Sequence, residues 1–232
     1  EITPGKYIFR TRELEQKEIE YFIHEKDWEK SFEMWHEEML KWIEHLGIPR
    51  KKMHLKEVEG KELAHYSKRT VDFEYPFPFG VDELYGLAYR TDFDLKNHAA
   101  GSGEDLSYTD FETNEKVVPH VIEPTWGVDR TFLAALCEAY REEDLPSVAS
   151  AEEGSPTAED GKTEARVVLK LPAWLAPIKV AILPLSKKET LSAVAEPLYA
   201  ELAQSFSCEY DETQSIGKRY RRQDEIGTPY CV

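Results

Sequence analysis

The stretch from Val117 to Tyr140 constrains the fold more than any other part of this 232-residue chain. It begins with VVPHVIEP, an apolar run that predicts a buried strand. TWG follows and predicts a sharp turn, and VDRTFLAALCEAY then predicts an apolar helix. Pro124 is expected to end the strand, and Gly127 to let the backbone approach a ligand closely.

This turn would place Glu123, Thr125 and Arg130 together at the mouth of a sheet. An acid, a hydroxyl and a guanidinium held on rigid elements can form a binding site. The alternative is an ordinary strand–helix corner, in which Glu123 caps the helix and Arg130 makes a surface ion pair. The stretch by itself does not exclude this alternative.

Charge and cysteine content limit the classes of protein to consider. The net charge is −16, so no overall positive field attracts nucleic acid, and phosphate contacts would need a local basic patch. A hydrophobic content of 41% is enough for a packed core. Cys137, Cys208 and Cys231 lie far apart without metal-ligand spacing, which is typical of a reducing compartment. No apolar run approaches membrane-spanning length. We therefore expect a cytoplasmic protein that does not interact with membranes.

The N-terminal part mixes strand and helix patterns. Residues 1–23 predict two strands around a turn at residues 3–6, with ion pairs between their charged side chains. Apolar residues at three- and four-residue steps predict an amphipathic helix over 31–46. Residues 65–95 predict strands and loops, with RTDFDL as a half-buried strand or a site wall, and the Gly-rich residues 98–110 predict a mobile loop.

An acidic stretch at residues 145–165 almost lacks large apolar side chains, which predicts a linker or insertion between two domains, 1–144 and 166–232. Beyond it, residues 178–185 predict a buried strand, 191–206 a helix and 208–210 a short strand.

The C-terminal segment carries four cations around Tyr220: Lys218, Arg219, Arg221 and Arg222. It is either a solvated charged loop or an RNA-binding segment in which bases stack on Tyr220.

Two stretches together resemble the second and third signature motifs of class II glycyl-tRNA synthetases of the dimeric, bacterial and eukaryote type. They are FRTRELEQKEIEYF at Phe9–Phe22 and VIEPTWGVDR. LAHYSKRT, RTDFDL and IGKRYRRQDEIGTP extend the resemblance over nearly the whole chain, with residues 145–165 matching least. The resemblance implies an α+β fold, with an antiparallel sheet flanked by helices and then an α/β anticodon-binding domain.

The same resemblance implies a ligase that joins ATP and glycine into glycyl-adenylate and transfers glycine to tRNA(Gly). It implies Mg²⁺ with the ATP, and a homodimer. Arg130 and Arg12 would be catalytic, because arginines stabilise the charge that develops on the α-phosphate. Arg130 would lie against adenine and the γ-phosphate, and Glu83 is a candidate Mg²⁺ ligand.

The resemblance also implies the binding residues. ATP would contact Glu1, Phe9, Arg10, Thr11, Arg12, Glu13, Leu14, Glu83, Leu84, Gly127, Val128, Asp129 and Arg130. Glycine would contact Leu14, Glu15, Gln16, Lys17, Glu18, Arg90, Glu123, Pro124, Thr125, Trp126 and Gly127. Glu18, Glu123 and Thr125 would hold the ammonium group, and Arg90 the carboxylate. The C-terminal cations Lys218, Arg219, Arg221 and Arg222 would contact tRNA.

Three positions depart from the family pattern. Leu14 replaces the phenylalanine that stacks on adenine, Thr125 replaces a serine, and Trp126 occupies a position that is often small or phenylalanine. The family's first motif and the Phe-Arg-Asn expected before Glu1 are not in this sequence, and the anticodon domain stops short. We therefore expect a piece of a longer protein that is inactive by itself.

Two alternatives stay open. One is a non-catalytic paralogue or fragment that binds tRNA or a protein partner with the same fold. The other is a prolyl-, threonyl- or histidyl-tRNA synthetase, which shares the third-motif arginine and the terminal domain but lacks this combination of VIEPTWG and RTDFDL.

Overall fold

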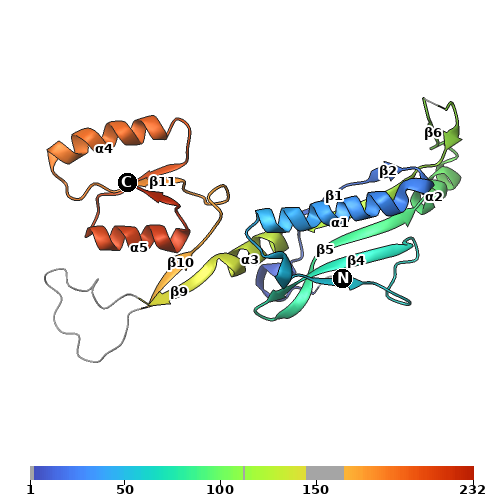
Figure 1. Ribbon diagram of the computed structural model, residues 1–232, viewed down its shortest axis with the longest axis horizontal. Helices are drawn as coiled ribbons and strands as arrows, with labels where there is room; N and C mark the ends of the chain where they lie inside the picture. The colour runs from blue at the N-terminus through green and yellow to red at the C-terminus, as the bar shows by residue number, and fades with distance from the viewer. Residues whose placement is uncertain (1–2, 112, 145–164) are drawn as a thin grey trace. The chain divides into compact units, whose positions relative to one another are not determined.

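The computed structural model describes residues 3–111, 113–144 and 165–232, which form two compact units, Glu1–Cys137 and Glu138–Val232 (Figure 1). The expected linker falls outside these ranges, apart from its last residue, Ala165. Glu1 also lies outside them. No helix in the described ranges is both long and apolar enough to cross a membrane.

The first unit is built on a six-stranded sheet in which every neighbouring pair is antiparallel. The main strand order is β1-β8-β5-β4-β3, and β2 also pairs with β8. The strands are β1 Gln16–Glu18, β2 Tyr21–Ile23, β3 His54–Glu57, β4 Arg69–Phe77, β5 Gly80–Thr91 and β8 His120–Gly127. The expected antiparallel sheet of an α+β fold is confirmed.

Among the residues described here, the remaining elements of the first unit are short, except for three helices. The helices are α1 Trp28–His45, α2 Phe93–Ser102 and α3 Val128–Ala139. The short elements are the 3₁₀ turns η1 Tyr7–Phe9, η2 Glu25–Asp27 and η3 Arg50–Lys52, and the strand pair β6 Tyr108–Thr109 and β7 Lys116–Val117.

Helix α1 packs on one face of the sheet, as the spacing of its apolar residues predicts. Phe32, Met39 and Ile43 are fully buried beneath it. Trp28 stacks on Tyr89 of β5 with ring centroids 4.6 Å apart. The helix begins three residues before the predicted start, and its position leaves the opposite face of the sheet available for a site.

The opposite face carries a row of polar or small residues that crosses four strands. Asp72 of β4 pairs with Gly86 of β5, Gly86 pairs with Thr125 of β8, and Thr125 pairs with Glu18 of β1. Alternate residues of a strand point to opposite faces, so the four share one side of the sheet.

The predicted hairpin at residues 1–23 is wrong. β1 and β2 do not pair with each other, but lie one after the other along the same edge of β8. Their pairing with β8 is interrupted opposite Pro124, which has no N–H to donate, although its carbonyl accepts from the Ile19 N–H at 3.2 Å. The long strand β8 therefore organises both short strands.

The predicted turn at TWG is also wrong. β8 runs on to Gly127, and α3 begins at the next residue. Pro124 does not end the strand, because Thr125 and Trp126 still pair with β5 on one side and β1 on the other. Tertiary pairing here overrides the local turn signals.

RTDFDL is not a strand throughout. β5 ends at Thr91, and Phe93 begins α2, which extends into the predicted mobile loop at 98–110. Gly103, at φ 76°, then ends the helix with its N–H bonded to the Ala99 carbonyl at 2.9 Å.

In its described residues, the second unit contains two small sheets and two helices. Its elements are β9 Tyr140–Asp144, β10 Ala165–Leu169, β11 Val180–Ile182, α4 Glu189–Leu202, β12 Cys208–Tyr210, α5 Ile216–Ile226 and β13 Tyr230–Cys231. β9 and β10 are antiparallel, whereas β12-β11-β13 is a parallel sheet with α4 and α5 on either side of it in Figure 1. The α/β organisation is confirmed. The helix predicted over 191–206 is α4, which ends at Leu202, before the exposed Phe206.

The C-terminal charged segment is a helix and not the loop that the sequence suggested. Its buried residues are Arg219 and Gln223, four positions apart. The helix therefore turns a polar stripe toward the protein, and the usual apolar periodicity is absent.

Candidate active site

Two adjoining cavities lie against the polar face of the six-stranded sheet. One has a volume of about 270 Å³ and the other about 320 Å³. Their linings share Gln16, Glu83, Gly86 and Thr125. A single elongated ligand can therefore occupy both cavities by passing over the Gly86–Thr125 pair.

The first cavity gathers most residues of the expected ATP site. Those that line it are Phe9, Arg10, Thr11, Leu14, Glu83, Leu84, Gly127, Asp129 and Arg130. Arg12, Glu13 and Val128 are not among the lining residues, and Arg12 and Glu13 are exposed. The cations at this cavity are thus Arg10 and Arg130, so a phosphate placed here would meet those two guanidiniums.

Arg130 is held in a fixed orientation at the start of α3. Its Nη1 donates to the Glu83 carbonyl at 2.7 Å and contacts Glu83 Oε2 at 3.2 Å. Its Cζ lies 4.3 Å from the centroid of the Phe9 ring, a cation–π contact. Phe9 in turn packs edge-on against Phe77 and Phe79. The guanidinium is therefore positioned by an aromatic surface and a strand carbonyl before any ligand binds.

The second cavity gathers the polar part of the expected glycine site. Gln16, Glu18, Arg90, Glu123 and Thr125 all line it. Of the other expected residues, Leu14, Glu15 and Gly127 line the first cavity. Lys17, Pro124 and Trp126 line neither.

Trp126 belongs to the opposite face of the sheet. Its ring packs edge-on near Trp35 of α1 and Tyr85 of β5, with centroids 6.4 and 6.3 Å away. Lys17 and Tyr85 are its strand neighbours, and Pro124 lies two residues before it on the same face of β8. Trp126 thus supports the site from behind.

A buried ion pair dominates the second cavity. Arg90 Nη1 lies 2.6 Å from Oε2 of Glu123, which is 7% exposed, and Arg90 Nε lies 2.8 Å from Asp94 Oδ2. The guanidinium also sits 4.2 Å from the centre of the Tyr66 ring. Burial opposes the charge on Arg90, but the bonds to Asp94 and Glu123 outweigh it and raise its pKa. The arginine stays charged and faces the cavity with its partner acid beside it.

Glu20 joins this group, although sequence reasoning did not select it. Burial and, after it, the neighbouring charge of Glu123 raise the pKa of the Glu20 carboxyl. Glu20 lies in the break between β1 and β2, opposite the Glu123–Pro124 step of β8. That register could not be read from the chain, because the sequence predicted a hairpin there.

Asp72 is a second residue that the sequence did not single out. It lines the larger cavity from β4, beside Gly86. Burial raises the pKa of Asp72 to about 6, and the charge of Glu83 adds to the shift. Carboxyls with raised pKa values are common at functional sites.

Asp72→Asn is expected to stabilise the protein at pH 7 by about 1 kcal/mol, after allowance for solvent screening of a half-buried group. The raised pKa means that the folded state disfavours the ionised carboxyl. The wild-type protein therefore loses stability as the pH rises from the pKa of Asp72 in the unfolded chain, near 4, through its folded pKa of about 6. Urea denaturation at pH 7 and at pH 4 measures this, and an equal gain at both pH values would contradict the pKa assignment.

Gly86 leaves the floor between the two cavities bare. A Cβ at this position would lie 3.1 Å from Thr125 Oγ1, which itself donates to the Gly86 carbonyl at 3.2 Å. A side chain at position 86 would therefore press on the hydroxyl and fill the passage between the cavities.

The site does not contain a ready-made metal cage. Within residues 3–111, 113–144 and 165–232, no three His, Cys, Asp or Glu side chains gather as metal ligands. Glu83 supplies one carboxylate, already in contact with Arg130. Mg²⁺ bound there would take most of its ligands from phosphate oxygens and water.

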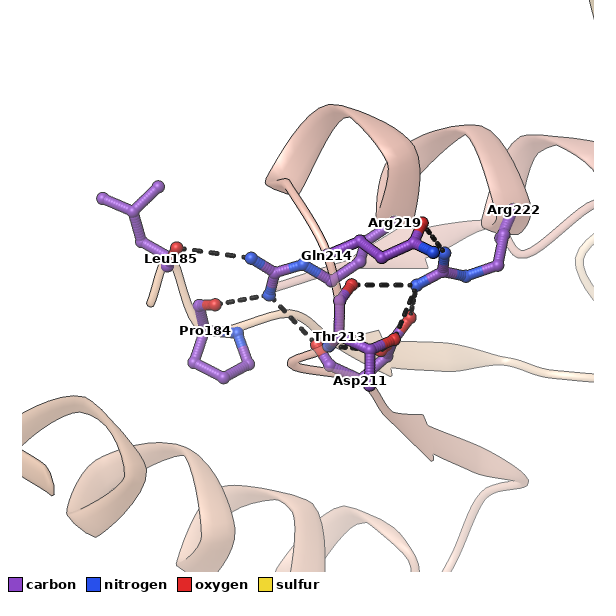
Figure 2. A network of polar contacts seen from close by, with 7 residues as sticks. All are labelled: Pro184, Leu185, Asp211, Thr213, Gln214, Arg219 and Arg222. Atoms are coloured by element: carbon purple, nitrogen blue, oxygen red, sulfur yellow. Dashed lines mark hydrogen bonds and ion pairs between the residues drawn. The ribbon is translucent and has the colours of Figure 1, made fainter. Parts of the chain in front are cut away.

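The four C-terminal cations differ in their surroundings, and Figure 2 shows two of them, Arg219 and Arg222. Arg219 is 2% exposed, and its guanidinium donates to the carbonyls of Pro184, Asp211 and Leu185 at 2.5, 3.1 and 3.3 Å. Both terminal nitrogens of Arg219 thus donate inside the second unit, whereas its buried Nε has no hydrogen-bond partner.

Arg222 also binds within the unit, since it pairs with the Asp211 carboxylate. Burial acts to raise the Asp211 pKa, but the bonds from Arg222 and Thr213 outweigh it and lower the pKa to about 2. Lys218 is exposed, whereas Arg221 is half-buried. Of the four, Lys218 is the most accessible to an external phosphate.

Comparison with known proteins concerns the chain as a whole. The chain is 52% identical over its whole length to the glycine–tRNA ligase of Macrococcus caseolyticus, and 49% identical to that of Corynebacterium glutamicum. This chain belongs to the glycine–tRNA ligase family. It spans about half the length of the curated relatives it matches, 46% and 49% of these two.

Two further comparisons concern its parts. The family of anticodon binding domains matches residues 179–232, within the second unit. The structure of Giardia lamblia prolyl-tRNA synthetase in complex with prolyl-adenylate is similar to this fold, with a TM-score of 0.64 over 99% of this chain and 42% of that chain. The sequence identity is 15%, so this likeness concerns the fold. The predicted class II synthetase fold is confirmed.

Proposed function

We propose that this chain is the catalytic and anticodon-binding part of a glycine–tRNA ligase. The reaction joins glycine to ATP as glycyl-adenylate, releases pyrophosphate, and transfers glycine to tRNA(Gly). The observation that carries the proposal is the Arg90–Glu123 ion pair in one cavity, directly beside a second cavity bordered by Arg10 and Arg130. Membership of the family supports it.

The charge pattern of the larger cavity suits a small zwitterion. Glycine carries an ammonium and a carboxylate but no side chain, so selection depends on its two charges and on limited room. Its carboxylate would bind the guanidinium of Arg90, and its ammonium group would bind the carboxylate of Glu123. Glu18 and the Thr125 hydroxyl line the same cavity. The ligand then substitutes for an ion pair, so neither protein charge is left buried and unpaired.

The smaller cavity suits a nucleotide. Attack of the glycine carboxylate on the α-phosphate builds negative charge, which fixed cations stabilise. Arg130 is already oriented by Phe9 and Glu83, and Arg10 lines the same space. Both cavities meet at Gly86 and Thr125, where the two substrates would join. Mg²⁺ would neutralise phosphate charge when bound, with Glu83 the residue proposed to contact it.

Leu14→Phe is expected to tighten ATP binding by about 0.5–1.5 kcal/mol, because an aromatic ring stacks on adenine better than an isobutyl group. Leu14 is 52% exposed and lines the smaller cavity, so the larger ring has room. Isothermal titration calorimetry with ATP measures the change. An unchanged dissociation constant would place adenine away from this side chain.

The proposal gives the second unit the role of tRNA binding, supported by its match to anticodon binding domains. Lys218 and Tyr220 are the exposed members of its cationic segment. A homodimer, which the family resemblance implies, and a cytoplasmic location, which the cysteine pattern predicts, are part of the same proposal.

The proposed function is tested by ATP–pyrophosphate exchange with each of the twenty amino acids, using the full-length natural protein. We expect exchange with glycine and little with alanine, serine or proline. Exchange driven by proline, threonine or histidine would indicate a related ligase instead. No exchange with any amino acid, together with retained tRNA or protein binding, would favour the non-catalytic alternative.

A further inference from the structure

The strand that carries Arg90 has a bulge at that residue. Tyr89 pairs with Ile122 of β8, and the next pair is Thr91 with Val121, so Arg90 has no partner in the β8 register. A bulge re-aims the side chains around it and is common beside functional sites. Here the side chain at the bulge is the one that meets Glu123 in the larger cavity.

The backbone at the bulge is strained. Thr91 has a φ of 59°, in the left-handed region, which β-branched residues rarely adopt. Such a conformation persists only where the surroundings hold it in place. The contacts of the residues next to Arg90 and Thr91 show what holds it.

One buried imidazole contacts both sides of the bulge. His120 is 9% exposed and begins β8. Its Nδ1 lies 2.5 Å from the Tyr89 hydroxyl, and its Nε2 lies 3.5 Å from Asp92 Oδ2. The Tyr89 contact is a hydrogen bond, and the Asp92 carboxylate faces the other ring nitrogen at a longer, electrostatic distance. The residue before Arg90 and the residue after Thr91 are thus linked through His120.

Both partners of His120 are themselves anchored. Tyr89 is fully buried and stacked on Trp28 of α1. Asp92 also binds Lys96 Nζ at 2.5 Å, across the first turn of α2. The imidazole therefore connects the core under α1 to the start of α2, with the bulge between them.

We propose that His120 is a positioning residue: by holding Tyr89 and Asp92 together, it fixes the bulge that aims Arg90 at the ligand's carboxylate. The inference rests on the proposed function, since it assigns that carboxylate to glycine. It adds a residue that touches neither cavity and that the motif resemblance did not select.

The test compares His120→Phe with Asp92→Asn in the full-length protein, using ATP–pyrophosphate exchange. Phenylalanine keeps the ring but removes both polar contacts. We expect the KM for glycine to rise roughly 5–20-fold in His120→Phe, with the KM for ATP within about twofold of wild type. Asp92→Asn should change the glycine KM in the same direction. The double variant should show less than the product of the two effects, since both act on one contact.

A glycine analogue separates positioning from general damage. Ethanolamine has the ammonium of glycine but a hydroxymethyl group in place of the carboxylate. If His120 acts through Arg90, His120→Phe leaves the inhibition constant of ethanolamine unchanged while the glycine KM rises. A matched control is His24→Phe, which removes another histidine–aspartate contact, to Asp110 at 3.2 Å, and should leave both constants unchanged.

Three results would overturn the inference. The first is an unchanged glycine KM in His120→Phe. The second is an equal rise in the KM for glycine, the KM for ATP and the inhibition constant of ethanolamine. The third, which applies if His120→Phe does not fold, is an unchanged glycine KM in Asp92→Asn. A wild-type protein without glycine-dependent exchange would instead reject the proposed function, and this inference with it. Normal wild-type exchange with unaffected variants would reject the inference alone.

Discussion

Arg219→Met is expected to destabilise the second unit by about 3 kcal/mol. The methionine stem fills similar space, but the carbonyls of Pro184, Asp211 and Leu185 each lose a charged donor. Removing one partner of a buried polar group costs more than its hydrogen bonds contribute, since the other partners stay desolvated. These carbonyls follow β11 and β12, so both connecting loops would loosen together.

Hydrogen-exchange mass spectrometry measures this loss separately in the two units. Protection should fall across β11, β12 and α5, with the first unit unchanged. Lys218→Met is the matched control, because this neighbour is exposed and its replacement should shift stability by less than about 0.5 kcal/mol. If Arg219→Met is as stable as the control, the bonds from Arg219 to the three carbonyls do not stabilise the second unit.

Glu123→Gln is expected to raise the KM for glycine roughly 30–150-fold, equivalent to about 2–3 kcal/mol. The amide keeps the size of the side chain but removes the charge that both Arg90 and the glycine ammonium would use. The KM for ATP should change less than about twofold, because Glu123 lines only the larger cavity.

Steady-state exchange kinetics with each substrate varied in turn measure both constants. Glu29→Gln makes the same charge change on α1, away from both cavities, and should leave both constants as in wild type. A Glu123→Gln enzyme with normal glycine kinetics would remove Glu123 from the ammonium site. Equal losses for glycine and ATP would indicate damage to the sheet.

Local sequence patterns predicted those helices and strands whose tertiary contacts favour the same structure as the local pattern. The spacing of Phe32, Met39 and Ile43 predicts α1 because the helix buries one apolar stripe. Residues 180–182 were recognisable because both faces of a central parallel strand are buried. The strand–helix junction was placed correctly at Val128, although its turn was not.

Other features depend on long-range partners that a sequence does not show. TWG has turn residues, yet β1 and β5 hold it in the sheet from both sides. The helix α5 escaped detection because Arg219 and Gln223 occupy its buried face in place of apolar residues. The bulge at Arg90 follows from contacts of His120 with residues about 30 positions away.

Site residues divide in the same way. The family resemblance selected Glu123, Arg90 and Arg130, and the structure brings them to two adjoining cavities. It did not select Asp72 or Glu20, whose places depend on the register of strands β4 and β8. Nor did it show that Arg219 and Arg222 are bound internally, because the fold around Asp211 creates those contacts.

The most direct test of the two-cavity site is a crystal structure of the full-length protein with a non-hydrolysable glycyl-adenylate analogue, glycyl-sulfamoyl-adenosine. We expect adenosine in the smaller cavity against Arg130, and the sulfamoyl link over Gly86 and Thr125. The glycyl ammonium should lie within hydrogen-bond distance of Glu123. An analogue bound elsewhere, or one whose glycyl group leaves the Arg90–Glu123 cavity empty, would contradict the two-cavity site.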